Sequence, residues 1–327
     1  MRIGAVKTME DFRVLVTEPI HPDGIKLMEE RGLRVVSLQP GSGEEDLLKG
    51  MVGADALVTR GGLRVSREAM KGSEKLRAIG VHGVGVDHID LQAARELGIV
   101  VFNTPAALTE TVAEMTIAIM LSLLRRVVSG DKAVRSGQWS RKYTDLIGTE
   151  LMGKTVGIIG LGRIGEAVAR RLRPFGVRMI YHDLRDRSDL EQELGIRKVS
   201  LEELLRQSDV ITIHLPLTSE TKGLISKREF DLMKEGVYLV NTARGGVVVQ
   251  RDLIDALGSG KVSGAALDVF EKEPLEMENP LIAMDNVILT PHLGASSHEA
   301  MRRMALEVAE GIIRISRGEW PPNVIVP

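Results

Sequence analysis

Apolar and polar positions along the chain alternate in blocks that predict strands and helices in turn. Short apolar runs bounded by glycine, proline or charged residues are typical of buried strands, and the longer amphipathic runs between them are typical of helices. The first hundred residues contain five strand-like runs: 13–17, 34–38, 56–60, 76–81 and 99–103. Helical runs separate them, and this alternation predicts a parallel sheet covered by helices on both faces.

The second half of the chain repeats this alternation. Its six strand-like runs are 155–160, 177–183, 210–215, 237–242, 264–269 and 287–292. The helical runs between them are 163–175, 201–207, 221–233 and 251–259. Six strands in this arrangement match a doubly wound dinucleotide-binding sheet.

Three further segments complete the pattern. The capping-box spacing of Thr111 and Glu114 predicts the start of a buried helix that runs to Leu124. The polar, glycine-punctuated segment 129–154 is interpreted as connecting structure. A last helix is predicted over about 297–317, before a proline-rich tail.

Composition narrows the classes of protein that this pattern fits. A hydrophobic share of 43% and a charged share of 27% are typical of a globular protein, and a net charge of −2 favours neither nucleic acid nor a membrane as partner. The absence of cysteine rules out disulfides, thiol catalysis and cysteine-ligated zinc, and we expect no metal. The N-terminus lacks a signal-peptide pattern, and the longest apolar run, 115–124, is too short to span a bilayer. We therefore expect a soluble, cytoplasmic protein.

A glycine-rich loop carries the first functional signal. The sequence 160-GLGRIG-165 follows a strand and opens a helix, as a dinucleotide-binding GxGxxG does. Its glycines permit a tight turn and the approach of a pyrophosphate, which the helix N-terminus favours. Asp183 ends the next strand, where a carboxylate is expected on the adenosine ribose, so NAD is favoured over NADP. Arg185 and Arg187 lie close by and keep a 2′-phosphate open as an alternative.

Three charged side chains are predicted at the carboxyl ends of three strands of this sheet. Arg244, Glu273 and His292 each follow or end one of the last three strand-like runs. The carboxyl ends of parallel strands meet at the edge where doubly wound sheets bind their ligands. We therefore expect an arginine, a carboxylate and a histidine beside the nicotinamide end of a bound dinucleotide.

These residue types suit hydride transfer between a dinucleotide and a 2-oxo acid. A guanidinium holds a carboxylate through two parallel hydrogen bonds. A histidine delivers a proton to the carbonyl oxygen as hydride reaches carbon, and takes it back in the reverse direction. A neighbouring carboxylate fixes the imidazole tautomer and favours its charged form. Each residue alone also has a structural interpretation, as a strand cap, a solvated loop residue or a backbone-bonded histidine, but the combination favours catalysis.

Seven motifs in order resemble the D-isomer-specific 2-hydroxyacid dehydrogenase family, and the resemblance runs from about Arg13 to Val326. They are 83-GVGVDHIDLQAA-94, 102-FNTPAALTETVAE-114, 157-GIIGLGRIGEAVA-169, 213-IHLPLT-218, 239-LVNTARGGVV-248, 267-LDVFEKEP-274 and 290-TPHLGAS-296. In that family the arginine of NTARGG binds substrate, and the glutamate of DVFxxEP pairs with the histidine of TPHLGA. The resemblance thus implies that Arg244, Glu273 and His292 are the catalytic residues.

The resemblance also implies a domain layout. A Rossmann-type NAD domain is inserted into a discontinuous, flavodoxin-like substrate domain, and both are α/β domains with doubly wound parallel sheets. The implied boundaries are 1–108 for the first part of the substrate domain, 109–295 for the NAD domain and 296–327 for the second part. Hinges are implied near 105–108 and 294–298. Family members are commonly dimers through the cofactor domain, so we expect a homodimer.

The family's binding residues carry over to matching positions. NAD is the implied cofactor, with contacts at Gly160, Gly162, Arg163, Ile164, Gly165, Asp183, His214, Pro216, Thr242, Ala243, Arg244, Asp268, His292 and Gly294. The implied substrate contacts are Arg60, His82, Gly83, Val84, Gly85, Asn103 and Arg244. The backbone N–H groups of the glycine-rich turn 83–85 suit a carboxylate, as anion-binding turns do.

The expected substrate is a small 2-hydroxy or 2-oxo acid. Oxidation of D-3-phosphoglycerate to 3-phosphohydroxypyruvate, a step of serine biosynthesis, is favoured because Arg60 resembles an arginine that 3-phosphoglycerate dehydrogenases use near the phosphate. However, Gly61 replaces the usual companion serine, and Val81-His82 stands where such enzymes commonly carry an arginine. Reduction of glyoxylate or hydroxypyruvate is therefore the alternative. The chain ends at 319-EWPPNVIVP-327, so we expect no appended serine-binding domain.

Two other interpretations differ in kind. A non-catalytic, NAD-sensing corepressor is possible because the fold also serves such proteins, which keep the catalytic residues. They add long disordered tails, which we do not expect in this protein. A formate-dehydrogenase-like enzyme needs a different partner for the histidine, and Glu273 argues against it.

Overall fold

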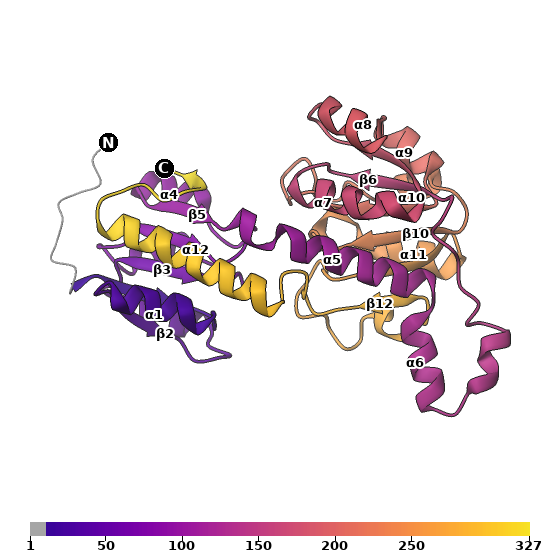
Figure 1. The fold of residues 1–327 in the computed structure, drawn as a ribbon. Helices are drawn as coiled ribbons and strands as arrows, with labels where there is room; N and C mark the ends of the chain where they lie inside the picture. The colour runs from indigo at the N-terminus through magenta and orange to yellow at the C-terminus, as the bar shows by residue number, and fades with distance from the viewer. Residues whose placement is uncertain (1–10) are drawn as a thin grey trace. The chain divides into compact units, whose positions relative to one another are not determined.

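The structure, a computed structural model, describes residues 11–327, which form two compact units. Unit 1 combines the residues up to Leu108 with Ala295–Pro327, and unit 2 is Thr109–Gly294. Unit 1 therefore contains the indigo beginning and the yellow end of the ribbon in Figure 1. The sequence pattern assigned no element to residues 1–12, of which 1–10 lie outside the described residues. Phe12 is buried in the core of unit 1.

Unit 1 is built on a six-stranded sheet with the order β13-β5-β4-β3-β1-β2. The five predicted strands are present and parallel: β1 (Arg13–Val16), β2 (Arg34–Ser37), β3 (Ala56–Thr59), β4 (Ala78–Val81) and β5 (Val100–Asn103). Their order, β2-β1-β3-β4-β5, is flavodoxin-like. The sixth strand, β13 (Val324–Val326), was not predicted and pairs antiparallel with β5. Its three residues carry too short a pattern to predict a strand, so the open edge of β5 decides its conformation.

Helices cover both faces of this sheet. They are α1 (Pro22–Glu30), α2 (Glu44–Met51), α3 (Arg67–Lys71), α4 (Leu91–Leu97) and α12 (His298–Ser316). The last helix, α12, packs against α1 and β4 (Figure 1). Gly311 of α12 makes room for the ring of Phe102 on β5, because a Cβ there would lie 2.2 Å from Phe102 Cε2. A helix from the far end of the chain thus completes this core.

Unit 2 is built on a seven-stranded parallel sheet with the order β12-β11-β10-β9-β6-β7-β8. The strands are β6 (Thr155–Ile159), β7 (Arg178–His182), β8 (Arg197–Lys198), β9 (Val210–Ile213), β10 (Val237–Asn241), β11 (Val262–Leu267) and β12 (Val287–Leu289). The six predicted strands are present, and the two-residue β8 is additional. This is the strand order of a doubly wound dinucleotide-binding sheet with one extra strand at the end. The predicted fold class is confirmed.

The helices of the second half differ from the predictions in four places, the first being a helix at Ser188–Leu194 that was not predicted. They are α5 (Pro105–Leu124), α6 (Val127–Arg135), α7 (Arg163–Leu172), α8 (Ser188–Leu194), α9 (Leu201–Gln207), α10 (Lys227–Leu232) and α11 (Gln250–Ser259). Helix α5 begins at Pro105 rather than near Thr111, because proline suits the first helical position. Segment 129–154, interpreted as connecting structure, contains most of α6 and a 3-10 helix. Helix α10 is shorter than predicted, since Gly223 turns with φ +66°.

Helix α5 is 20 residues long and apolar enough to cross a membrane by length and composition alone. Of its most apolar stretch, 50% is buried inside the protein. Ile119, Met120, Leu123 and Leu124 belong to the hydrophobic core of unit 2. Burial in that core accounts for the apolar character of this helix.

Candidate functional site

The glycine loop joins β6 to α7 and has the geometry that a dinucleotide requires. Gly160 has φ +91°, and a Cβ there would lie 2.7 Å from the carbonyl oxygen of His214. A Cβ on Gly165 would lie 2.1 Å from the carbonyl oxygen of Gly160. No atom would come within 4 Å of a Cβ on Gly162, which caps α7. Two glycines therefore permit close packing, while the third leaves space in front of the helix N-terminus, where a pyrophosphate fits.

Asp183 follows β7 and lies directly beside this loop. Its carboxylate accepts hydrogen bonds from the backbone N–H of Leu161 at 2.7 Å and of Arg185 at 2.8 Å. Arg187 donates to the carbonyl oxygen of Leu161 at 2.8 Å and to Glu166 at 2.9 Å. The suggestion that Arg187 binds a 2′-phosphate is therefore not supported, because its guanidinium is already occupied.

Three further predicted cofactor residues follow the ends of β9 and β10: His214, Pro216 and Thr242. The half-buried His214 ring forms a hydrogen bond through Nε2 with the Thr212 hydroxyl at 3.0 Å. Burial lowers the pKa of His214 to about 3, so the ring is neutral. Pro216 is exposed. The hydroxyl of Thr242 is buried against that of Thr116 on α5, at 2.8 Å. Sequence reasoning missed Thr116, which lies inside an apolar helix and gave no signal.

The structure brings two of the three charged strand-end residues into direct contact. His292 Nδ1 and Glu273 Oε2 are 2.8 Å apart. Because a carboxylate only accepts, Nδ1 carries the hydrogen and Nε2 is left for proton exchange. Burial raises the pKa of Glu273, but hydrogen bonds from His292 and the Phe270 N–H, with the charges of His292 and Arg244, outweigh it and lower that pKa. Glu273 is therefore a charged partner of the imidazole.

A buried carboxylate, Asp268, holds the turn that carries His292. It accepts hydrogen bonds from the backbone N–H groups of Leu293 and Gly294, both at 2.7 Å, and from the Thr290 hydroxyl at 2.6 Å. His292 itself has φ +53°, a conformation that a non-glycine residue adopts only when its surroundings enforce it. Sequence reasoning gave Asp268 only a cofactor contact and missed Thr290. Their role in orienting the histidine is visible only in the structure.

Arg244 follows β10 in a turn that packs tightly against the turn after β11. A Cβ on Gly245 would lie 1.9 Å from the backbone of Phe270, so only glycine fits there. The side chain of Asn241 donates to the carbonyl oxygen of Arg244 at 3.0 Å and accepts from the N–H of Ala243 at 3.0 Å. This packing places the Arg244 charge where it lowers the pKa of Glu273. Asn241 was another residue that sequence reasoning missed, although it directly precedes the predicted Thr242.

The predicted substrate residues lie at strand ends of unit 1. Gly83 has φ +156°, and its N–H donates to Thr104 at 3.0 Å. The Asn103 amide donates to the carbonyl oxygen of Val84 at 2.8 Å. Among the described residues, the N–H groups of Val84 and Gly85 donate to no other group. These two donors are the part of the turn that remains for a carboxylate.

Arg60 follows β3, and hydrogen bonds hold both its guanidinium and its backbone N–H. Its guanidinium donates to the carbonyl oxygen of Pro19 at 2.8 Å and lies 3.6 Å from the sulfur of Met301. Glu18, which sequence reasoning missed, accepts from the backbone N–H groups of Arg60 at 2.9 Å and Gly62 at 2.7 Å.

His82 does not suit the predicted role as a substrate contact. Its ring is only 3% exposed, and Nε2 donates to the carbonyl oxygen of Met301 on α12 at 3.3 Å. Its buried Nδ1 has no partner among the described residues. Burial, with the charge of Arg60, lowers the pKa of His82 to about 4. The residue is a neutral core histidine, because helix α12 packs over it.

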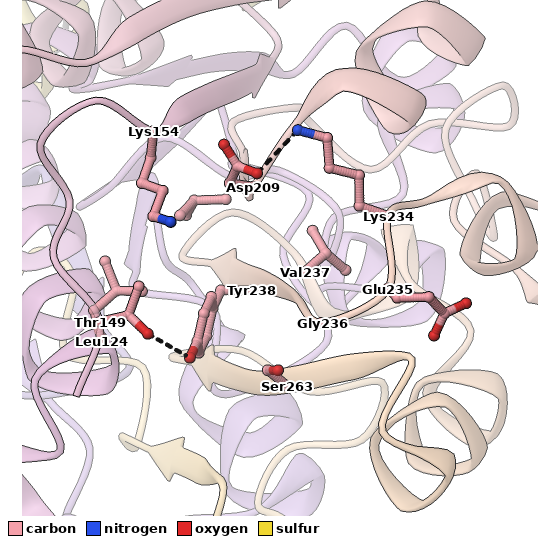
Figure 2. A pocket seen from close by; sticks show the side chains of 11 residues that line it. Leu124, Thr149, Lys154, Asp209, Lys234, Glu235, Gly236, Val237, Tyr238 and Ser263 are labelled. Atoms are coloured by element: carbon pink, nitrogen blue, oxygen red, sulfur yellow. Dashed lines mark hydrogen bonds and ion pairs between the residues drawn. The ribbon is translucent and has the colours of Figure 1, made fainter. Parts of the chain in front are cut away.

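A pocket of about 290 Å³ lies at the edge of the unit 2 sheet where its strands begin (Figure 2). This edge is opposite the one where the strands end and the glycine loop and His292 follow. Lys234 pairs with Asp209 at 2.9 Å, and Tyr238 and Thr149 share a hydrogen bond of 3.1 Å. The glycine loop, Arg244, Glu273 and His292 all follow strand ends instead, so this pocket is not the predicted site. Over residues 11–327, no group of three or more metal-binding side chains comes together.

The fold and the glycine loop define a dinucleotide-binding protein, and comparison with known proteins names its family. Residues 117–294 match the family model "D-isomer specific 2-hydroxyacid dehydrogenase, NAD binding domain". A glyoxylate reductase of Korarchaeum cryptofilum is 42% identical over 316 residues, which are 96% of this chain and 95% of that protein. A D-lactate dehydrogenase of Aquifex aeolicus, solved with NAD and lactic acid, is similar with a TM-score of 0.84 and 32% identity, covering 96% of this chain and 99% of that one.

A D-3-phosphoglycerate dehydrogenase of Methanocaldococcus jannaschii is 43% identical over 314 residues. This match covers 96% of the chain but only 59% of that relative, so the chain spans about three fifths of its length. The chain belongs to the D-isomer specific 2-hydroxyacid dehydrogenase family and carries its NAD-binding domain.

Proposed function

We propose that the protein catalyses NAD-dependent interconversion of a small 2-oxo acid and the D-2-hydroxy acid. The observation that carries the proposal is the His292–Glu273 pair beside Arg244, at the carboxyl edge of an NAD-binding sheet. When bound, NADH supplies the hydride. His292 Nε2 delivers the proton to the carbonyl oxygen, Glu273 holds the ring through Nδ1, and Arg244 binds the substrate carboxylate.

The residues of the cofactor site fit NAD. The space in front of Gly162 and the N-terminus of α7 suit the pyrophosphate, and Asp183 suits the ribose hydroxyls while repelling a 2′-phosphate. Arg163, Ile164, His214, Pro216, Thr242, Asp268 and Gly294 are the further proposed contacts. We propose that unit 1 supplies the substrate contacts other than Arg244 and that unit 2 supplies Arg244 and the cofactor contacts.

Two kinds of substrate within this class, phosphorylated and unphosphorylated, have specific support. D-3-Phosphoglycerate, which would place the protein in serine biosynthesis, is supported by Arg60, whose second guanidinium nitrogen faces only a methionine sulfur, a weak acceptor. Glyoxylate or hydroxypyruvate is supported by the lack of a cation at positions 81 and 82, since Val81 is apolar and buried and His82 is neutral. The named relatives include enzymes of both kinds.

We also propose a cytoplasmic homodimer joined through unit 2. Several large apolar side chains are exposed along one stretch of unit 2: Val127, Val134, Trp139, Tyr143, Ile147 and Met152. A cluster of this kind on a soluble protein is typical of a protein–protein interface.

The test is a panel of NADH oxidation assays with phosphohydroxypyruvate, hydroxypyruvate, glyoxylate and pyruvate. His292→Asn should lower turnover by about two to four orders of magnitude, because proton delivery is lost, while NADH still binds. Arg60→Ala should lower kcat/KM only for the phosphorylated substrate if Arg60 binds the phosphate, and the exposed Arg64→Ala is its matched control. Near-normal turnover by His292→Asn would refute the acid–base assignment. NADH binding without reduction of any oxo acid would favour the NAD-sensing alternative.

A further inference from the structure

Arg187 connects the glycine loop to the segment that carries Asp183. It directly precedes α8, four residues after Asp183, and only 22% of its side chain is exposed. One terminal nitrogen donates to the carbonyl oxygen of Leu161 at 2.8 Å. The other donates to Glu166 at 2.9 Å and to Asp189 at 3.1 Å, and Nε donates to Asp189 at 3.2 Å.

Leu161, the middle residue of the Gly160–Gly162 turn, is thereby held at both of its backbone polar groups. Its N–H donates to Asp183 at 2.7 Å, and its carbonyl oxygen accepts from Arg187. The peptide groups on either side of Leu161 cannot rotate without breaking one of these bonds. A loop held in this way does not have to be ordered when the cofactor binds, which favours affinity.

The backbone of Arg187 is itself fixed from the core. Its N–H donates to the hydroxyl of the fully buried Tyr181 at 3.2 Å, and that hydroxyl donates to Glu191 at 2.9 Å. Burial and the bond to Glu191 raise the pKa of Tyr181 to about 12, so the phenol keeps its hydrogen. The position of the guanidinium is therefore determined by a chain of contacts that begins in the sheet.

Arg187 also compensates a negative charge near the phosphate position. Glu166 lies in the first turn of α7, the helix whose N-terminus faces that space. Burial raises the pKa of Glu166, but hydrogen bonds from Arg187 and Arg170, with their charges, outweigh burial and lower that pKa, so the carboxylate is charged. An uncompensated carboxylate there would repel a pyrophosphate.

We propose that Arg187 is a positioning residue of the cofactor site with two effects. It fixes the glycine loop in the conformation that receives the pyrophosphate, and it is withheld from a 2′-phosphate because Glu166 and Asp189 occupy its guanidinium. Selection of NAD thus depends on these two carboxylates as well as on Asp183. The proposal rests on the NAD dependence of the proposed function, but not on which oxo acid is reduced.

NADH binding to the full-length protein, measured by fluorescence, tests the first effect. Arg187→Ala should raise the dissociation constant roughly 10- to 100-fold, since hydrogen bonds to charged groups are lost, and Arg187→Lys should restore part of it. Amide hydrogen exchange of 160–162 in the cofactor-free protein should quicken in Arg187→Ala. Arg197→Ala, which removes a surface ion pair between β8 and Glu203 of α9, is the control. A dissociation constant within twofold of wild type in Arg187→Ala would overturn the proposal, even if no oxo acid were reduced.

NADPH binding tests the second effect. Asp183→Ala removes the carboxylate that repels the 2′-phosphate but leaves Arg187 occupied. Adding Asp189→Ala should free Nε of Arg187, while its bonds to Leu161 and Glu166 remain, and tighten NADPH binding severalfold beyond the single variant. Equal NADPH affinities of the single and double variants would show that Arg187 is not withheld.

Discussion

At the scale of single residues, buried polar groups decide where the chemically active side chains point. His292 adopts a left-handed backbone conformation, and Asp268 holds it there through three hydrogen bonds to the surrounding turn. Glu273 then meets Nδ1 of the imidazole, while its second oxygen accepts from the Phe270 N–H at 3.0 Å. The histidine therefore has its tautomer and its direction set by two different carboxylates.

The Glu273 carboxylate should be needed for its charge as well as for its hydrogen bond. Glu273→Gln keeps an acceptor for Nδ1 but loses the negative charge, so we expect turnover to fall about 100-fold. Steady-state turnover at saturating oxo acid and NADH measures this fall. Glu276→Gln, on the same loop, is the control and should keep wild-type turnover, whereas unchanged turnover in Glu273→Gln would contradict the assigned role.

At the scale of elements, helix α12 is held onto the sheet of unit 1 by contacts that sequence position does not suggest. Its residues pack around Phe102, and its Met301 carbonyl oxygen accepts from His82 at the end of β4. His82 is neutral because burial and the Arg60 charge lower its pKa to about 4, while Met301 and Glu18 act weakly in the other direction.

Lowering the pH should destabilise the packing of α12 over His82. The unfolded chain binds a proton at His82 below about pH 6.5, whereas the folded chain does not until about pH 4, so stability falls as pH falls through that window. From pH 7 to pH 5 the loss from this group is on the order of 2 kcal/mol. His82→Gln, which keeps a donor for Met301, should therefore show a smaller drop in melting temperature between pH 7 and pH 5. Parallel curves for the two proteins would contradict a neutral buried histidine.

At the scale of the whole molecule, the chain leaves an apolar stretch uncovered. Helix α6, the 3-10 helix at Trp139–Tyr143 and the following loop expose large side chains, among them Tyr143 at 73% and Ile147 at 69%. Most apolar side chains elsewhere in unit 2 lie in two continuous cores. A second copy of the chain is the partner that we propose for this stretch.

Mass measurement by light scattering should show a particle of twice 35.8 kDa for the wild type. Replacing both Tyr143 and Ile147 with Glu should give the monomer mass, because burying two unpaired carboxylates in an interface is costly. Met277→Glu, at another exposed apolar position of unit 2, is the control and should leave the dimer intact. A monomeric wild type would refute the proposed assembly.

The sequence by itself determined the features that depend on neighbouring residues. Alternating runs predicted eleven of the strands because buried parallel strands are apolar on both faces. The glycine loop, Asp183 and the strand-end residues Arg244, Glu273 and His292 could be predicted as site residues because turn chemistry and strand ends are local signals. Helix starts were less accurate, as the start of α5 at Pro105 shows.

Only the tertiary structure decided the features that depend on residues far apart in the chain. Two of these features lie in unit 1: the pairing of β13 with β5 and the burial of His82 under α12. Two lie in unit 2: the hydrogen bonds to Asp268 that hold the turn of His292, and the ion pairs of Arg187 with Glu166 and Asp189. A short strand, a histidine or an arginine has the same local pattern whether or not it finds such a partner. Its conformation and charge are set by packing and hydrogen bonding in the folded chain, which no local pattern contains.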